Sequence, residues 1–451
     1  MKRVLFFVTA FASLGVAAQQ SFSGVNTSQY GGMYKVINNP ANIVDGINRF
    51  AFNALSVDGY FGNNKMGLTT NLTKSFNDFT TNITAQNDIN ADVNLDVLGP
   101  SFYFHVGRKN AFAFTSRVRA LVDVRGVDAK VIQAFMSGTG DLNLTNNGYN
   151  LSIDKQYAVA NAFSEFAFSW ARLISKSEHH SYKVGITAKI VRGAISTHAG
   201  FSEINGNIAA NVTERNGEAY LDVTVGTGET SEFLFSNGGV SLAKNLTVGD
   251  ALKSHATGLG FDIGFVYEYR KEGCPSCTLA PYDFKLGISL TDLGRLKYTV
   301  NEDSYKYTLN PGVYQINLSN IQESISQNVA AVQTPLHGTT FTSSLPAALR
   351  LNGDARVIGP LFVDVAAYVN LANASKTYNA AYSSGFTITP RAEWKYAGVY
   401  LPFSTTKGAG TNVGVALRLG PLFVGSRSIV SNLISKNAKE LNVFAGLQFE
   451  I

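Results

Sequence analysis

The sequence predicts an all-β fold, a transmembrane antiparallel β-barrel of about fourteen strands, and three observations support this class. The chain ends in a strand of alternating apolar and polar residues. Its predicted connections alternate between long and short, and its first residues have the form of a secretory signal. Together these features are typical of barrels that cross the outer membrane of bacteria.

The last eleven residues, 441–451, show the alternation most clearly. One face is apolar from Leu441 to Ile451. The opposite face is polar or small apart from Phe444, and it carries Asn442, Gly446, Gln448 and Glu450. A strand of this length, rising roughly 3.3 Å per residue and tilted by about 45°, spans about 25 Å, the height of the apolar band of an outer-membrane barrel.

Residues 1–18 are predicted to be a signal peptide. Lys2 and Arg3 precede an apolar run over 4–17, and Val16-Ala17-Ala18 offers small residues for cleavage. No cysteine stands at the cleavage point, so a lipid anchor is not expected. We therefore expect export to the outer membrane with cleavage near Ala18, an N-terminal segment at 19–48 and a barrel at 49–451.

Runs of alternating apolar and polar residues mark about fourteen strands. Within 110–124, for example, Phe112, Phe114 and Val118 share one face, while Arg117 and Arg119 share the other. The strands are expected near 49–60, 98–107, 110–124, 163–175, 181–193, 258–270, 282–297, 344–357, 361–372, 385–395, 397–405, 411–419, 421–427 and 441–451.

The connections favour a barrel over a two-sheet sandwich. Long connections (61–97, 125–162, 194–257 and 298–343) alternate with tight turns such as 107–110, 176–180 and 358–360. Outer-membrane barrels have long loops outside and short turns in the periplasm, and an even strand count places both termini in the periplasm. The insertion 194–257 contains strand-like runs at 206–213 and 218–225 and is expected to form a projecting hairpin, while 298–343 is a candidate for a short helix.

The composition excludes several classes of protein. Outside the predicted signal peptide, no segment reaches the ~20 continuous apolar residues of a membrane helix, although 45% of the residues are hydrophobic. A net charge of +5, dispersed along the chain, does not indicate a nucleic-acid partner. None of the 6 histidines stands in a nucleophile motif, so neither an enzyme nor a cofactor or metal site is expected.

Cys274 and Cys277 are the only cysteines, and they lie in a predicted periplasmic turn. An oxidising compartment favours a structural disulfide between them over free thiols. The surrounding sequence lacks both the helix of a redox motif and the further ligands of a zinc site.

Inward-facing charges are the most function-like feature of the predicted barrel. Two interpretations remain open. Charges of both signs pair across a narrow lumen and hold the N-terminal segment, or a cationic excess around 110–125 forms a path for an anionic ligand such as a fatty acid. The candidate lumen residues are Arg117, Arg119, Asp123, Arg125 and Lys189.

Several motifs resemble known barrels. Asn39-Pro40-Ala41-Asn42 before the first strand, and the runs 287–294 and 344–350, resemble the FadL-type long-chain fatty-acid transporters and the PorV-like barrels of type 9 secretion. The runs 398–403 and 417–426 are similar to an uncharacterised family of outer-membrane β-barrels from the same superfamily. The resemblance implies fourteen strands and a plug formed by the N-terminal segment around Asn39 to Asn42.

The resemblance also implies two alternative functions. A FadL-type barrel takes up hydrophobic small molecules across the outer membrane. A PorV-like barrel transports nothing itself and docks a secretion or surface-assembly complex. The expected partners are therefore outer-membrane lipid and either a hydrophobic ligand or a subunit of such a complex.

Overall fold

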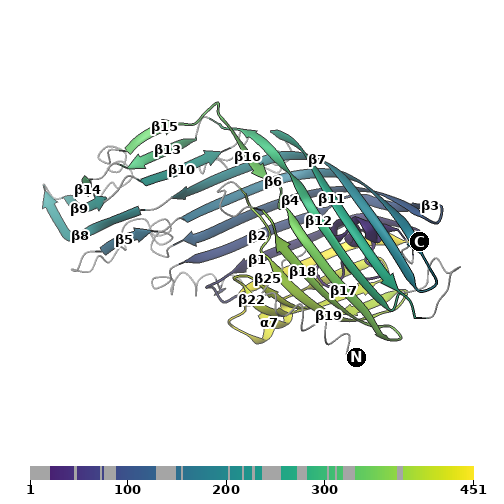
Figure 1. Ribbon diagram of the computed structural model, residues 1–451. Coiled ribbons are helices and arrows are strands. Elements are labelled where there is room, and N and C mark those ends of the chain that lie inside the picture. Colours follow the sequence, from purple (N-terminus) through teal and green to yellow (C-terminus); the bar gives the residue numbers. More distant parts are fainter. Residues whose placement is uncertain are drawn as a thin grey trace.

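The structure is a computed structural model, and it forms a long twisted β-barrel with strands that project beyond one end (Figure 1). It describes residues 21–44, 48–71, 74–75, 88–127, 149–153, 156–201, 204–215, 218–225, 229–235, 255–271, 282–301, 304–309, 312–317, 331–372 and 379–451. The predicted signal peptide and the pair Cys274 and Cys277 lie outside these residues.

Fourteen antiparallel strands form the wall, and pairing of the first with the last closes it. Four of the fourteen are interrupted and carry two labels each. In chain order the wall consists of β1 (Phe50–Asn63), β2 with β3 (Ile89–Leu98, Ser101–Val106), β4 (Asn110–Val127), β6 (Gln156–Lys176), β7 (His180–Phe201), β11 (Ala256–Tyr269), β12 (Phe284–Thr299), β16 with β17 (Thr340–Ser344, Ala348–Ile358), β18 (Leu361–Asn370), β19 (Gly385–Glu393), β20 with β21 (Ala397–Tyr400, Phe403–Thr406), β22 with β23 (Gly410–Val413, Val415–Leu419), β24 (Leu422–Ser426) and β25 (Glu440–Glu450).

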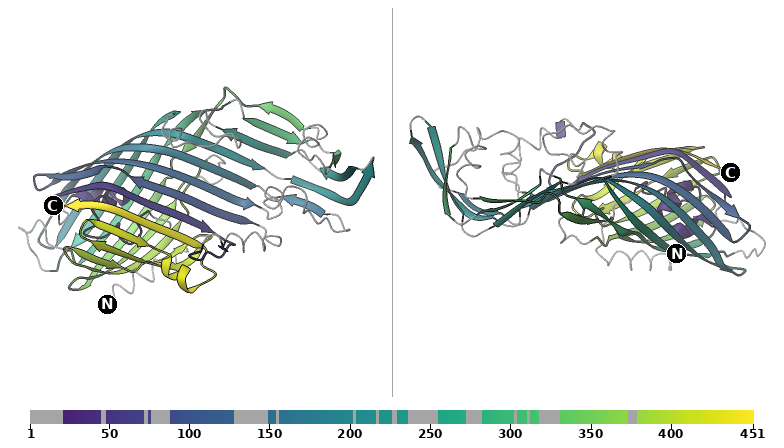
Figure 2. Two further views of the ribbon diagram at one scale, coloured as in Figure 1. Left: turned by 180° about the vertical axis from the view of Figure 1, so that it is seen from behind. Right: turned by 90° about the horizontal axis from the view of Figure 1, so that it is seen from above.

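The projecting part continues from the wall at one end (Figure 2). β10 (Glu229–Phe235) pairs with the end of β7 and with β13 (Tyr305–Leu309), which pairs with β15 (Ala331–Pro335). A separate sheet contains β5 (Tyr149–Ile153), β8 (Ile204–Arg215), β9 (Glu218–Val225) and β14 (Gly312–Asn317). The predicted hairpin is therefore confirmed as β8–β9. The described residues of 298–343 are strands and connections, without the expected short helix.

The side chains of the wall are apolar outside and polar inside. Phe168, Leu259 and Phe261 point outward and are 59%, 61% and 53% exposed. On the inward face, Arg119 is 0% and Glu165 2% exposed. A water-soluble barrel would bury the apolar face, so this wall is built to lie in a hydrocarbon layer. Separately, no helix among the described residues has the length and apolar character needed to cross a bilayer.

The strand that was predicted to start near 98 begins nine residues earlier, at Ile89. In β2 the outward residues Val93, Leu95 and Val97 alternate with Asp92, Asn94 and Asp96. Because the inward face of β2 is acidic, its sequence resembles that of a polar loop, and the sequence analysis placed it in a connection. The cations that pair with these carboxylates, Arg117 and Arg125, come from the neighbouring strand β4.

Short connections gather at one end of the barrel, which we call the turn end. They are 107–109, 177–179, 359–360, 394–396 and 420–421. The other end, the loop end, carries the long connections and the projecting sheets (Figure 1). One connection differs from the expected pattern, because β21 and β22 are joined at the loop end by the tight turn 407–409.

The wall is interrupted at Gly99-Pro100, between β2 and β3. Proline has no N–H to donate to the ladder. Asn53 of β1 compensates, since its side-chain amide donates to the main-chain oxygens of Leu98 and Gly99 at 3.0 and 2.9 Å. On the other side Ser116 Oγ donates to Pro100 O at 2.9 Å. Polar side chains of both neighbouring strands, Asn53 and Ser116, thus bond to the wall at the interruption.

The described part of the N-terminal segment, residues 21–44, is almost entirely buried. It contains the helix α2 (Gly32–Asn38) and the 3-10 turn η1 (Pro40–Ile43). Figures 1 and 2 show these purple turns enclosed by the strands of the wall. η1 lies against β6, β7 and β11, and α2 lies against β1 and β25.

Candidate functional site in the barrel lumen

The lumen is divided along the barrel into an apolar cluster, a layer of charges and a second apolar cluster. The inward residues of β4 follow this order from the turn end, with Ala111 and Ala113, then Arg117 and Arg119, then Leu121. The loop-side cluster contains Leu121, Val159, Phe163, Val191, Leu296, Tyr298, Phe341, Tyr368 and Tyr382. The turn-side cluster packs Phe22, Val25, Met33 and Tyr34 of the N-terminal segment against Leu98, Tyr103, Tyr400, Phe423 and Phe444.

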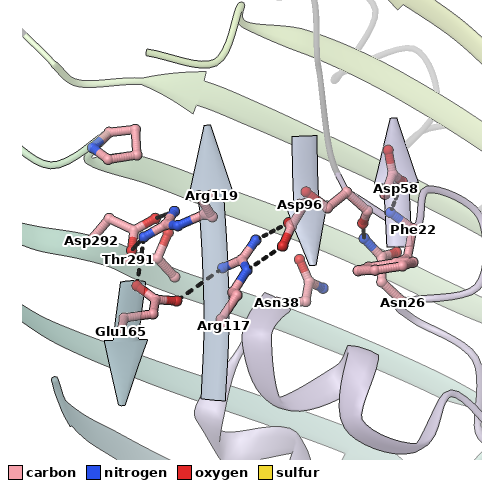
Figure 3. A network of polar contacts seen from close by, with 12 residues as sticks. Phe22, Asn26, Asn38, Asp58, Asp96, Arg117, Arg119, Glu165, Thr291 and Asp292 are labelled. Atoms are coloured by element: carbon pink, nitrogen blue, oxygen red, sulfur yellow. Dashed lines mark hydrogen bonds and ion pairs between the residues drawn. The ribbon is translucent and has the colours of Figure 1, made fainter. Parts of the chain in front are cut away.

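Between the clusters lies the charge layer, which we define as Asp96, Arg117, Arg119, Glu165, Lys189, Asp262 and Asp292. Figure 3 shows Asp96, Arg117, Arg119, Glu165 and Asp292 of this layer. Arg117 Nε donates to Asp96 Oδ1 at 2.6 Å, and a second guanidinium nitrogen reaches Glu165 at 3.4 Å. Arg119 Nη2 donates to Glu165 at 2.7 Å. These charge-assisted pairs link β2, β4 and β6.

Lys189 completes the charge layer from β7. Its ammonium lies 2.8 Å from Asp262 on β11 and 2.6 Å from Asp292 on β12. Asp292 also accepts two hydrogen bonds of 2.8 Å from Arg119. Three cations therefore face four carboxylates, all with at most 5% of the side chain exposed. An excess of positive charge is absent from this layer.

A β-bulge in β12 places Asp292 in the lumen. Before the bulge Lys285, Ser289 and Thr291 point inward, and after it Leu296 and Tyr298 do. Both Thr291 and Asp292 are buried, and the pairing with β11 shifts at this point. Asp292 has φ 60°, a left-handed conformation that Asp tolerates better than most residues. Its N–H donates to Asp262 Oδ1 at 2.7 Å, which holds the bulge.

The predicted lumen residues fall into two groups. Arg117, Arg119 and Lys189 lie together in the charge layer. Asp123 and Arg125 lie closer to the loop end, where Arg125 pairs with Asp92 and lies 3.5 Å from Asp123. Asp123 Oδ2 accepts from the N–H of Ala381 at 2.9 Å. Arg125 thus links β4 to the neighbouring strand β2, and Asp123 links β4 to the connection that precedes β19.

A small cavity separates the charge layer from the N-terminal segment. Val36 and Ile37 of α2 line one side, and the other side includes Arg117, Glu165 and Lys189. Its volume is about 10 Å³, which fits one water molecule. The described lumen at this height is therefore filled rather than open.

Asn39 to Asn42 rest where three inward positions of the wall are glycines. A Cβ at Gly185 of β7 would lie 2.8 Å from Ala41 Cα, and one at Gly264 of β11 would lie 3.0 Å from Pro40 Cδ. Gly185 and Gly264 are direct partners in the ladder. The third, Gly287 of β12, would place its Cβ 3.4 Å from Asn39 Nδ2. This glycine cradle lets the segment approach the wall closely.

Asn39 uses its side chain in two directions. Its amide nitrogen donates to the main-chain oxygens of Phe265 and Ile288, each at 3.1 Å. Its amide oxygen accepts from the N–H of Ala41 at 2.9 Å and so caps η1. Pro40 starts η1, where a helical N–H is not needed. This geometry gives a structural reason for the Asn-Pro-Ala-Asn sequence.

Further polar contacts hold the segment elsewhere. Phe22 N donates to Asp58 Oδ2 at 2.6 Å, and Lys285 Nζ donates to the oxygen of Thr27 at 2.9 Å. Ser289 Oγ donates to the oxygen of Asn38 at 2.8 Å. Within the segment, Lys35 Nζ donates to the oxygen of Gln29 at 3.0 Å, and burial lowers the pKa of this ammonium to about 8.

The sequence analysis missed Asp96, Glu165, Asp262 and Asp292 as candidate site residues, although each pairs with a predicted cation. Alternation within one strand indicates the face but not the partner on another strand. For Asp292, the bulge also reverses the alternation. Within the described ranges, His, Cys, Asp and Glu side chains form no group of three that is suited to a metal.

A closed antiparallel wall that is apolar outside and charged within defines this protein as an outer-membrane β-barrel. A model of the family of unknown function DUF5723 matches residues 40–426, and the chain belongs to this family. No curated protein sequence matches the chain.

Several solved structures are similar at low identity. The toluene transporter TbuX of Ralstonia pickettii is 13% identical with a TM-score of 0.44, covering 96% of this chain and 98% of that chain. The toluene transporter TodX of P. putida is 9% identical with a TM-score of 0.41, covering 94% and 95%. The translocator domain of the autotransporter NalP from Neisseria meningitidis is 7% identical with a TM-score of 0.32, covering 90% of each.

Proposed function

We propose that the protein takes up a hydrophobic small molecule across the outer membrane, with its long connections outside the cell and the N-terminal segment as a plug. The proposal assigns it no catalytic step, cofactor or metal. The observation that carries the proposal is the loop-side cluster. It places aromatic and aliphatic side chains in the lumen on the loop side of the charge layer, at the end where a ligand would enter.

The loop-side cluster has the composition of a binding site for an apolar ligand. Tyr298 and Phe341 stack with ring centroids 5.4 Å apart, and Tyr368 meets Tyr382 edge to face at 6.0 Å. The hydroxyls of Tyr298 and Tyr382 are buried without a hydrogen-bond partner among the described residues. An aromatic lining with a few polar atoms is usual for small-molecule sites. A ligand that parts these rings would bury its apolar surface there.

The charge layer is the barrier that such a ligand meets next. An apolar molecule gains nothing from passing between paired charges, and separating the pairs is costly. The interruption of the wall at Gly99-Pro100 lies at this height, since Leu98 is the ladder partner of Arg117. In this proposal the path therefore leaves the lumen sideways at this interruption.

Uptake of a neutral fluorescent naphthylamine by cells that produce the full chain tests the proposal. We expect uptake to be faster with the wild-type chain than without it, and to fall several-fold with Phe341→Ala. The matched control is Phe423→Ala, which removes an inward aromatic ring from the turn-side cluster. Equal uptake with and without the chain would exclude this function. An equal loss in both variants would show that stability rather than binding limits uptake.

A second candidate function is a barrel that docks a secretion or surface-assembly complex and transports nothing. The filled lumen favours it, because the charge layer and residues 21–44 leave a cavity of only about 10 Å³ between them. Native mass spectrometry of the protein from its own membrane separates the two. A stable protein subunit together with absent probe uptake supports docking, whereas a bound apolar ligand supports uptake.

A further inference from the structure

Three cationic side chains lie together on the outer surface of the barrel, at the loop end of the apolar belt. They are Arg192 of β7 and Arg295 and Lys297 of β12, and all three are exposed. The residues that precede them on the same face are Ile190, 46% exposed, and Leu293, 38% exposed. We call Arg192, Arg295 and Lys297 the outer cationic patch.

The register of the wall brings the patch together. β11 lies between β7 and β12 and pairs with both (Figure 1). Leu259 of β11 is the partner of Ile190 on one side and of Arg295 on the other. Arg192 is the partner of Thr257. Arg192 and Arg295 are two strands and two positions apart, about 12 Å between their main chains. Two arginine side chains that reach toward each other can close this gap on one anionic group.

The patch differs from every inward cation described above. Arg117, Arg119 and Lys189 are buried and paired with carboxylates. The three patch residues form no ion pair or hydrogen bond with any other described residue. The outward positions of β6, β7, β11, β12 and β16 also carry no acidic side chain over their described residues. Within this part of the chain the three charges therefore have no anionic partner, and a bound ligand can supply one.

The surroundings indicate the chemistry of that partner. Two arginines offer paired N–H donors that suit phosphate, and Thr257 and Thr342 add exposed hydroxyls beside them, Thr342 as the ladder partner of Lys297. On β6, Ser164 and Ala162 leave space next to Arg192. Directly below, Leu259 and Phe261 are 61% and 53% exposed and would contact acyl chains. The ligand thus combines a phosphate head with an apolar tail.

We propose that the outer cationic patch is a binding site for a phosphorylated lipid of the leaflet at the loop end. The phosphate accepts hydrogen bonds from Arg192 and Arg295 and lies near the Lys297 ammonium, while the acyl chains cover β11. Arginine and lysine clusters beside a membrane surface attract anionic lipids in this way. The site does not depend on any transport through the lumen.

Native mass spectrometry of the full chain in detergent tests the site. The probes are a diphosphorylated hexa-acyl glucosamine disaccharide and its phosphate-free version. We expect the wild type to retain the phosphorylated probe about tenfold better than the phosphate-free one. The triple variant Arg192→Gln, Arg295→Gln and Lys297→Gln should abolish this preference. The control is Arg172→Gln, an exposed outward arginine of β6 near the turn end, which should retain it.

Three results would overturn the proposal. They are an unchanged preference in the triple variant, an equal loss in Arg172→Gln, and displacement of the lipid by millimolar inorganic phosphate. The last would identify a site for free phosphate rather than for lipid. Because the substituted side chains are exposed, all variants are expected to fold, and heat-modifiable migration on a gel checks this.

Discussion

Asp292 accepts two hydrogen bonds of 2.8 Å from the guanidinium of Arg119, although 173 positions separate them in the chain. The pair forms because the bulge in β12 turns the Asp292 side chain inward with φ 60°. The same carboxylate also contacts Lys189 at 2.6 Å. Asp292 thus joins β12 to β4 and β7 across the lumen, and it makes the charge layer continuous.

Replacing Asp292 by asparagine should destabilise the barrel strongly. Asn tolerates the left-handed backbone but leaves Arg119 and Lys189 with one negative charge fewer. Breaking a buried ion pair by removing one partner costs about 3–5 kcal/mol. We expect the free energy of unfolding in urea, measured in phospholipid vesicles, to fall by this order.

Asp88 provides the matched control. It also has a positive φ, 55°, but it is exposed near the loop end. Asp88→Asn should change the free energy of unfolding by less than about 0.5 kcal/mol. If Asp292→Asn were equally mild, the charge layer would contribute little to stability and its role as a barrier would need another explanation.

Most of the wall follows from the sequence, whereas the contacts across the lumen do not. The outward face of β25 and the inward face of β4 follow from alternation alone, because each side chain needs only its own strand to set its direction. The carboxylates of Asp96 and Glu165 meet Arg117 only through the order of the strands. The inward position of Asp292 is harder still to predict from the sequence, since one extra residue at the bulge reverses the alternation of inward and outward side chains.

For the N-terminal segment, too, the sequence predicts one part of the structure, and the other part depends on how the strands pair. The Asn39 to Asn42 motif was recognisable, and its resemblance implied a plug. The glycines that receive it, Gly185 and Gly264, are 79 positions apart and look like ordinary small residues in curved strands. Only the register of β7 against β11 shows that they form one surface.

Gly185→Ala should displace residues 21–44 from the lumen. The new Cβ would lie 2.8 Å from Ala41 Cα, a contact with the main chain that rotation of a side chain does not relieve. We therefore expect the variant to insert and fold, but to show more open conductance in planar bilayers than the wild type does. Cleavage of the segment by added protease should rise in parallel.

Gly353→Ala is the control for this substitution. Its Cβ would meet only Leu286 Cδ2 at 3.5 Å, an ordinary contact. Conductance should equal that of the wild type. Closed channels in Gly185→Ala would mean that residues 21–44 do not block the lumen, and that the charge layer alone closes it.

Docking of residues 21–44 in the lumen should strengthen as the pH rises from about 8 to 10.5. The lower value is the pKa of buried Lys35, and the upper value is the ordinary pKa of lysine. Burial disfavours the ammonium, while Glu450 and Glu393 favour it and Lys285 and Lys183 oppose it. Below pH 8 Lys35 is charged whether the segment is docked or not, so the full cost of burial remains. Above 10.5 it is neutral in both states, and that cost is gone.

Subtilisin cleavage of the segment, followed by mass spectrometry between pH 7 and 10, measures this dependence. Cleavage of the wild type, relative to Lys35→Met, should fall as the pH rises. Lys35→Met keeps the apolar stem but has no charge to titrate, so it corrects for the pH dependence of the protease. Parallel curves for the two proteins would show that Lys35 does not control docking.

The interruption at Gly99-Pro100 should open when Asn53 is replaced by leucine. The substitution removes the donor to the oxygens of Leu98 and Gly99, and a buried acceptor without a partner costs about 1–3 kcal/mol. We expect the free energy of unfolding to fall by that order and the neutral naphthylamine probe to leak faster from vesicles that contain the variant.

Asn161→Leu separates leakage from general loss of stability. Asn161 is also buried in the lumen, but its amide donates to the hydroxyls of Ser196 and Ser343, away from Gly99-Pro100. We expect it to lower stability without faster leakage. If both variants leak equally, the wall does not open at Gly99-Pro100 in particular. The sideways path in the proposed uptake would then have to be replaced by one along the lumen, through the charge layer.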